Sequence, residues 1–215
     1  NSVEQKKDYI IESAELMELI NLPSTKILDF RDASLYNEGH IINAINISRR
    51  DIEDASFPYS GVMASKRKIE ELFSKLGINS KDTIVIYDDN GLCEAARLWW
   101  ILQNYNFDNL KLLNGGIAAW LDANGELSTE KTVLKPSQFK LPDNPTMKYL
   151  VSKKELNVAL EENTIIIDTR SYDEFTGKHL KKGASRAGRI PKSVHIDWAK
   201  NINFNGDKRF KIKEE

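Results

Sequence analysis

A short polar segment that ends in a thiol is the part of this sequence best suited to chemistry. It follows the apolar run TIVIY and precedes a stretch with helical apolar periodicity. A glycine-containing turn that leads into a helix presents successive backbone N–H groups, and these form a cradle for an anion or a thiolate. A thiol held in such a cradle has a lowered pKa and is nucleophilic. The segment comprises Asp88, Asp89, Asn90, Gly91, Leu92 and Cys93.

Cys93 is the only cysteine of the chain and has two interpretations. In one it is a catalytic thiolate at a helix N-terminus. In the other it is a small apolar residue packed under the loop, since free cysteines are often buried. The carboxylate of Glu94 would raise the thiol pKa, which favours the second interpretation. One thiol excludes a disulfide within the chain and a zinc site of several thiolates, and His40, His179 and His195 lack metal-ligand spacing, so we expect no metal and no other cofactor.

The elements around this loop alternate between strands and helices. This alternation predicts an α/β fold with a central parallel sheet flanked by helices. Sites in such sheets lie at the carboxyl ends of the strands, which is where the polar loop falls. The sequence predicts helices over residues 13–20, 63–77, 93–105 and 116–124, and strands over residues 26–30, 83–87 and 110–113.

The chain contains an internal repeat. The segment ILDFRDASLY at residues 27–36 recurs as IIDTRSYDEF at 166–175, an offset of 139 residues. A second segment, GHIINAINI at residues 39–47, recurs as GRIPKSVHI at 188–196. A period above about 100 residues indicates duplicated domains, because solenoid repeats are only about 20–50 residues long.

We therefore expect a complete domain over residues 1–127, a linker over 128–147 and a partial second domain over 148–215. Three of the six prolines fall in the linker range, where regular apolar positions are few. The second copy extends 47 residues past Asp168, whereas the first extends 91 residues from Asp29 to its last helix. A half-domain would leave apolar strand faces and unpaired edges in water.

This incomplete half has two expected consequences. The natural protein is expected to continue past residue 215, or another chain is expected to complete the second copy, so self-association through this half is predicted. We also expect residues 148–215 to pack on the first copy, or on another chain, through the apolar strand 164–167.

A carboxylate and an arginine recur at matching positions of the two copies. Asp29 and Arg31 in the first correspond to Asp168 and Arg170 in the second. Either pair could supply catalytic charges, but a pair present in both copies, with or without a cysteine, more naturally braces the strand end. In the second copy the arginine could also line a shared cleft, so Asp168 and Arg170 are candidate cleft residues.

Charge and hydropathy exclude several classes of function. The chain has 31 basic and 32 acidic residues and a formal net charge of -1. A nucleic-acid or membrane surface would normally show a basic excess or stripe, so we expect neither partner. No apolar run is long enough for a transmembrane helix. The chain begins with Asn1, which leaves a cytoplasmic and a periplasmic or exported location both open.

The ordered motifs resemble the rhodanese (thiosulfate/3-mercaptopyruvate sulfurtransferase) family, specifically its tandem-domain members. The first copy matches through DFRDASLYNEGHIINAINI, VIYDDNGLCEAARLWWIL and LLNGGIAAW, and the second through IIDTRSYDEFTGK and AGRIPKSVHIDW. The resemblance implies a central parallel sheet flanked by helices. It also implies transfer of sulfane sulfur from a small donor, thiosulfate or 3-mercaptopyruvate, through a cysteine persulfide to a small thiophilic acceptor.

One departure from the family pattern decides the functional prediction. The position of the family's nucleophile holds Asp88, which cannot form a persulfide. We expect its carboxylate to accept the N–H groups of residues 90–93 and to have a lowered pKa as a result. The first copy would then be inert, this chain alone inactive, and the catalytic cysteine located beyond residue 215. The alternatives are a non-catalytic binding or scaffolding module, and a sensor or sulfur carrier based on Cys93.

Overall fold

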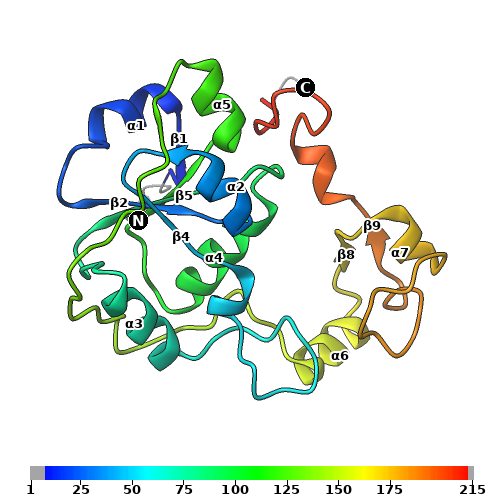
Figure 1. Cartoon of the computed structure of the whole chain (residues 1–215). Coiled ribbons are helices and arrows are strands. Elements are labelled where there is room, and N and C mark those ends of the chain that lie inside the picture. The colour runs from blue at the N-terminus through cyan, green and yellow to red at the C-terminus, as the bar shows by residue number, and fades with distance from the viewer. Residues whose placement is uncertain (1–7, 213–215) are drawn as a thin grey trace, which may run out of the picture.

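The computed structural model describes residues 8–212 (Figure 1). A five-stranded sheet forms the centre of the first part of the chain, residues 8–127, and the second part comprises residues 148–212. The strand order is β1-β6-β5-β2-β4, and every neighbouring pair is parallel. The central strands are apolar on both faces, as a parallel sheet covered on both sides requires. The strands are β1 (Ile10–Ile11), β2 (Thr25–Asp29), β4 (Ala44–Asn46), β5 (Thr83–Tyr87) and β6 (Leu110–Leu113).

Helices cover both faces of this sheet (Figure 1). Leu28, Ile84 and Ile86 lie in one apolar cluster with residues of α3 and α4. Ile27 and Val85 point to the opposite face, where α1, α2 and α5 supply the partners. The expected parallel sheet with flanking helices is therefore confirmed. The helices are α1 (Ser13–Leu19), α2 (Ala33–Glu38), α3 (Lys66–Lys75), α4 (Cys93–Asn104) and α5 (Gly116–Asp122).

Local sequence signals fix the ends of these elements. The Ser65 hydroxyl accepts a hydrogen bond from the Lys68 N–H at 3.2 Å and caps α3. Gly77 follows the other end of α3 with a φ of 73°, a left-handed conformation that glycine adopts without strain. β5 and β6 have the predicted bounds, while α3 is shorter than the predicted helix 63–77 because its first residues lie before the serine cap.

The predicted linker packs on the first part of the chain and supplies part of its core. Phe139 and Leu141 are buried, and the Phe139 ring meets the Phe73 ring edge-on with centroids 4.9 Å apart. The backbone N–H of Phe139 donates to the Ser74 hydroxyl at 2.9 Å. At the start of this range, β7 (Leu127–Ser128) pairs antiparallel with β3 (His40–Ile41). The division into domains at residues 127 and 147 stays a prediction.

The second part of the chain repeats the strand-helix-strand order of β2, α2 and β4 (Figure 1). Its two strands form a separate parallel sheet. Ile165 and Ile167 are 78% and 51% exposed, and within residues 8–212 the strand pairs with β9 alone. Strand 164–167 therefore does not pack on the first copy within these residues, and the other alternative of the prediction, pairing with another chain, stays a prediction. The elements are α6 (Lys153–Glu161), β8 (Ile167–Asp168), α7 (Tyr172–Thr176), β9 (Val194–His195) and the 3₁₀ helix η2 (Trp198–Asn201).

Contact between the two parts is made by other residues. The Trp100 indole N–H donates to the Tyr149 carbonyl at 3.0 Å, and a segment after η2 reaches back to the loop between β5 and α4. Within the described residues, none of the helices has the length and apolar character needed to cross a membrane.

Candidate active-site loop

The side chain of Asp88 fills the cradle at the carboxyl end of β5. One carboxylate oxygen, Oδ1, accepts the backbone N–H groups of Asn90 at 3.0 Å and Leu92 at 2.9 Å. The other, Oδ2, accepts those of Glu94 at 2.9 Å and Ala95 at 3.1 Å. The expected convergence on Asp88 is present, but its donors extend to residue 95, into the first turn of α4.

The backbone of the loop curls because two successive residues are left-handed. Gly91 has a φ of 67° and Leu92 a φ of 64°. This conformation turns successive N–H groups towards one point and forms an anion-binding concavity. The backbone of Asp88 is held from the other side, since its carbonyl accepts the Ile117 N–H at 3.1 Å. A Cβ at Gly116 would overlap this carbonyl, so the start of α5 needs glycine there.

The pKa of Asp88 is raised, contrary to the expectation from the sequence. Its side chain is only 1% exposed, and burial raises the pKa of the carboxyl group by more than the four backbone hydrogen bonds lower it. Burial removes the water that would stabilise the charged form. The prediction of a lowered pKa counted the hydrogen bonds but omitted the depth of the site, and it is wrong.

Cys93 is exposed at the first residue of α4, so the interpretation that packed it under the loop is wrong. Partial shielding from water, followed by the negative charges of Glu94 and Asp88, raises the pKa of the Cys93 thiol, and Arg49 and Lys181 oppose this shift. Cys93 bonds to the loop through its backbone, where its N–H faces the Asn90 carbonyl at 3.5 Å. The thiol therefore lies outside the cradle and is not activated by it.

Asp29 and Arg31 brace the end of β2 beside the loop. The guanidinium of Arg31 donates to Asp29 through Nε and Nη2, the latter at 2.6 Å, and Nη2 also donates to the Gly39 carbonyl at 2.7 Å. The Tyr87 hydroxyl donates to Asp29 Oδ2 at 2.5 Å and accepts the Ile41 N–H at 3.1 Å. The bracing role is thus the one the geometry supports. Tyr87 was not singled out from the sequence, although it directly precedes the loop.

Asp168 and Arg170 repeat this arrangement in the second part of the chain. Arg170 Nη2 donates to Asp168 Oδ2 at 2.6 Å and to the Gly188 carbonyl at 2.9 Å. The hydrogen bond from Arg170 lowers the pKa of Asp168. Both residues line a pocket of 660 Å³, together with Arg186 and Arg189. Their hydrogen bonds and ion pairs within residues 8–212 do not reach the Asp88 loop, so the chain holds two separate groups of candidate residues.

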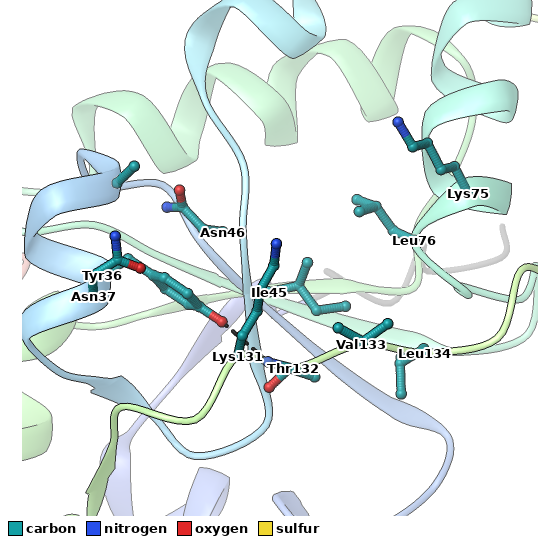
Figure 2. Close-up of a pocket in the computed structure, with 11 residues that line it drawn as sticks. Tyr36, Asn37, Ile45, Asn46, Lys75, Leu76, Lys131, Thr132, Val133 and Leu134 are labelled. Atoms are coloured by element: carbon teal, nitrogen blue, oxygen red, sulfur yellow. Dashed lines mark hydrogen bonds between the residues drawn. The ribbon is translucent and has the colours of Figure 1, made fainter.

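A further pocket of 510 Å³ lies beside the outer strand β4 (Figure 2). Figure 2 shows the Tyr36 side chain crossing it, and the Tyr36 hydroxyl donates to the Ala44 carbonyl at 2.8 Å and accepts the Thr132 N–H at 3.4 Å. The remaining lining combines the ammonium groups of Lys75 and Lys131 and the amides of Asn37 and Asn46 with apolar side chains. Its lining contains no thiol, so it offers no acceptor for sulfur.

Comparisons with known proteins agree on one family. The model of the rhodanese-like domain matches residues 12–123. The thiosulfate sulfurtransferase of Azotobacter vinelandii is 32% identical over 193 residues, which cover 88% of this chain and 69% of that protein. The sulfur carrier protein TtuD of Thermus thermophilus is 29% identical over 219 residues, which cover 97% and 75%.

The fold is shared with a solved structure of similar extent. The 3-mercaptopyruvate sulfotransferase SseA from Escherichia coli, described as having the rhodanese fold, superposes with a TM-score of 0.83 at 24% identity. The match covers 97% of this chain and 80% of that one. The likeness therefore extends through both parts of the chain.

Proposed function

The chain belongs to the rhodanese-like domain family, and on that premise we propose that it is part of a tandem sulfurtransferase whose first domain is not catalytic. Asp88 carries this proposal, because it occupies the loop position where a sulfur-carrying thiolate would lie. Its carboxylate accepts four backbone N–H groups, which are therefore already paired and not available to another anion.

The chemistry of sulfur transfer explains why this position is inert. A thiolate attacks the outer sulfur of thiosulfate, forms a persulfide and expels sulfite. Cyanide or another thiophile then takes the outer sulfur and returns the thiolate. A carboxylate has no sulfur atom on which a persulfide could form, so it cannot replace the thiolate in the first step. The thiol of Cys93, with its raised pKa, is a poor substitute.

The second part of the chain supplies the features that suit an anionic sulfur donor. Arg170, Arg186 and Arg189 line the same pocket. Guanidinium groups bind carboxylates and oxyanions through paired hydrogen bonds, as thiosulfate or 3-mercaptopyruvate would require. We propose that the persulfide-forming cysteine lies beyond residue 215, where the second domain would continue.

The test is the formation of thiocyanate from thiosulfate and cyanide by the 215-residue chain. We expect no turnover above background, and we expect Cys93→Ser to change nothing. Turnover that Cys93→Ser abolishes would overturn the assignment of an inert first domain. The variant Asp88→Cys should gain a mass of one sulfur atom after incubation with thiosulfate, because the left-handed Gly91 and Leu92 curl the loop into a concavity of N–H groups suited to a thiolate.

The alternative function is a non-catalytic binding or scaffolding module, and the complete occupation of the cradle by Asp88 favours it. The two functions differ in what happens in the longer protein. A persulfide detected by mass spectrometry on a cysteine after residue 215, following thiosulfate treatment, supports sulfur transfer. Its absence there supports the module.

A further inference from the structure

Residues 198–210, which we call the C-terminal segment, pack on the Asp88 loop around Gly91. In Figure 1 this orange and red segment turns back from β9 towards α5. We infer that this loop, whose N–H groups are paired with the Asp88 carboxylate, binds the C-terminal segment and so holds the second part of the chain on the first. The loop therefore has a binding partner within the same chain, residues 198–210.

The centre of the contact is Gly91. A Cβ at this position would overlap Ile202 Cδ1 and would lie 3.5 Å from the Phe204 ring and 3.6 Å from the Trp198 ring. Ile202 is 3% exposed, in contrast to Ile165 of the same part of the chain at 78%. Ile202 can therefore pack closely on the loop because Gly91 has no side chain.

Polar contacts surround this apolar centre. The Lys208 ammonium donates to the Asp89 carbonyl at 2.9 Å, and the Phe210 N–H donates to the Asn114 side-chain oxygen at 2.9 Å. Asn114 follows β6, the neighbour of β5 in the sheet. The segment therefore spans the carboxyl ends of two adjacent strands, which orients it as well as holding it.

The C-terminal segment has its own internal structure. Ile202 and Phe210 form an antiparallel bridge, and the Asn203 N–H donates to the Arg209 carbonyl at 2.9 Å. The Trp198 and Phe204 rings meet edge-on with centroids 5.6 Å apart. A segment already ordered in this way loses less conformational entropy on docking than a flexible tail would.

The packing of the C-terminal segment on the loop explains why a carboxylate, that of Asp88, occupies the cradle. An empty cradle under an apolar cover would hold several N–H groups without partners, which is costly away from water. Asp88 satisfies these groups without a bound anion, so the outer face of the loop is free to receive Ile202. The inference therefore stands whether or not the protein transfers sulfur.

The test is a double-mutant cycle between Gly91 and Ile202 in the intact chain, read by hydrogen exchange of the peptide 198–212. Ile202→Ala should speed exchange of this peptide by about tenfold or more, because exchange follows the population of the undocked state. The matched control Ile165→Ala should leave exchange of the peptide unchanged. Equal effects of the two substitutions would overturn the inference.

The cycle separates docking from the conformational strain of a substitution at Gly91. Gly91→Ala introduces strain at a φ of 67° as well as the overlap with Ile202, but the strain is the same with and without Ile202. Docking therefore predicts a smaller effect of Gly91→Ala in the Ile202→Ala background, and additive effects contradict it. Lys208→Met, which leaves the backbone intact, should give a smaller increase in exchange, and no increase would also count against docking.

Discussion

The carboxylate of Asp88 and the backbone N–H of Ala95 are joined by a hydrogen bond of 3.1 Å. This bond ties the residue after β5 to the first turn of α4, across the whole loop. Helix N-termini carry partial positive charge, so a carboxylate is well placed there. The four backbone N–H groups of the loop that donate to this carboxylate therefore have hydrogen-bond partners without a bound ligand.

Asp88→Ala should lower the free energy of unfolding by about 3 kcal/mol, because buried N–H groups without partners cost about 1–3 kcal/mol each and water or small shifts recover part of this. Urea titration of the intact chain measures the change. The control is Asp89→Ala, since Asp89 is exposed and contacts Lys208 through its backbone carbonyl. Sulfate should restore part of the stability of Asp88→Ala and none for the control. Equal losses in the two variants would contradict the cradle.

The raised pKa of Asp88 determines how its contribution to the free energy of unfolding changes with pH. The folded chain binds this proton more tightly than the unfolded chain, where the pKa is about 3.9. The contribution of Asp88 to stability is thus fully present below about pH 3.9 and is lost as the pH rises through the folded pKa. The difference in unfolding free energy between the natural chain and Asp88→Ala should narrow from about pH 4 upward. A difference that widens would show that the hydrogen bonds outweigh burial.

The sequence predicted the site where the determinants are local. TIVIY is an unbroken apolar run and forms β5 with the predicted bounds, and the glycine of the next loop indicates the turn that feeds α4. Asp88 is packed against α5, which is distant in the sequence and contacts it through Gly116 and Ile117. The direction of its pKa shift could therefore not be obtained from neighbours in the chain. The orientation of Cys93 depends on the left-handed conformation of Leu92, which no residue-type preference indicates.

The sequence patterns could not predict contacts between residues that are far apart in the chain. Lys208 and Asp89 are 119 positions apart, and neither belongs to a periodic element. Phe139 packs in the core from a segment without helix or strand, so no apolar periodicity marked it as buried. The repeat itself did predict a feature of this kind, because the Asp168 and Arg170 pair reproduces the geometry of Asp29 and Arg31.

We propose that the exposed apolar strands of the second part associate between copies of this chain. Ile165, Ile167 and Val194 are exposed on or beside β8 and β9, where an extended sheet would cover them. Sedimentation velocity should show a larger species that grows with concentration. The double substitution Ile165→Asp and Ile167→Asp should shift the distribution to monomer, while Val133→Asp, at an exposed position of the predicted linker, should not. A monomer at all concentrations would exclude this association.

The two arginines of the repeat should differ in their contribution to stability. Arg31 and Arg170 make the same paired contact with an aspartate and the same bond to a glycine carbonyl, but their side chains are 7% and 42% exposed. Lysine keeps the charge and loses the planar fork, so each substitution removes the paired geometry alone. Arg31→Lys should cost about 2 kcal/mol, because the buried Asp29 carboxylate would lose its paired guanidinium contact and keep only the Tyr87 hydroxyl and the residue 31 backbone N–H as donors. Arg170→Lys should cost less than about 1 kcal/mol, as is usual for exposed pairs. Urea titrations of the two variants measure the two losses in unfolding free energy. A larger loss for Arg170→Lys would contradict the ranking and would mean that Arg170 stabilises the second part of the chain by more than its exposed contacts predict.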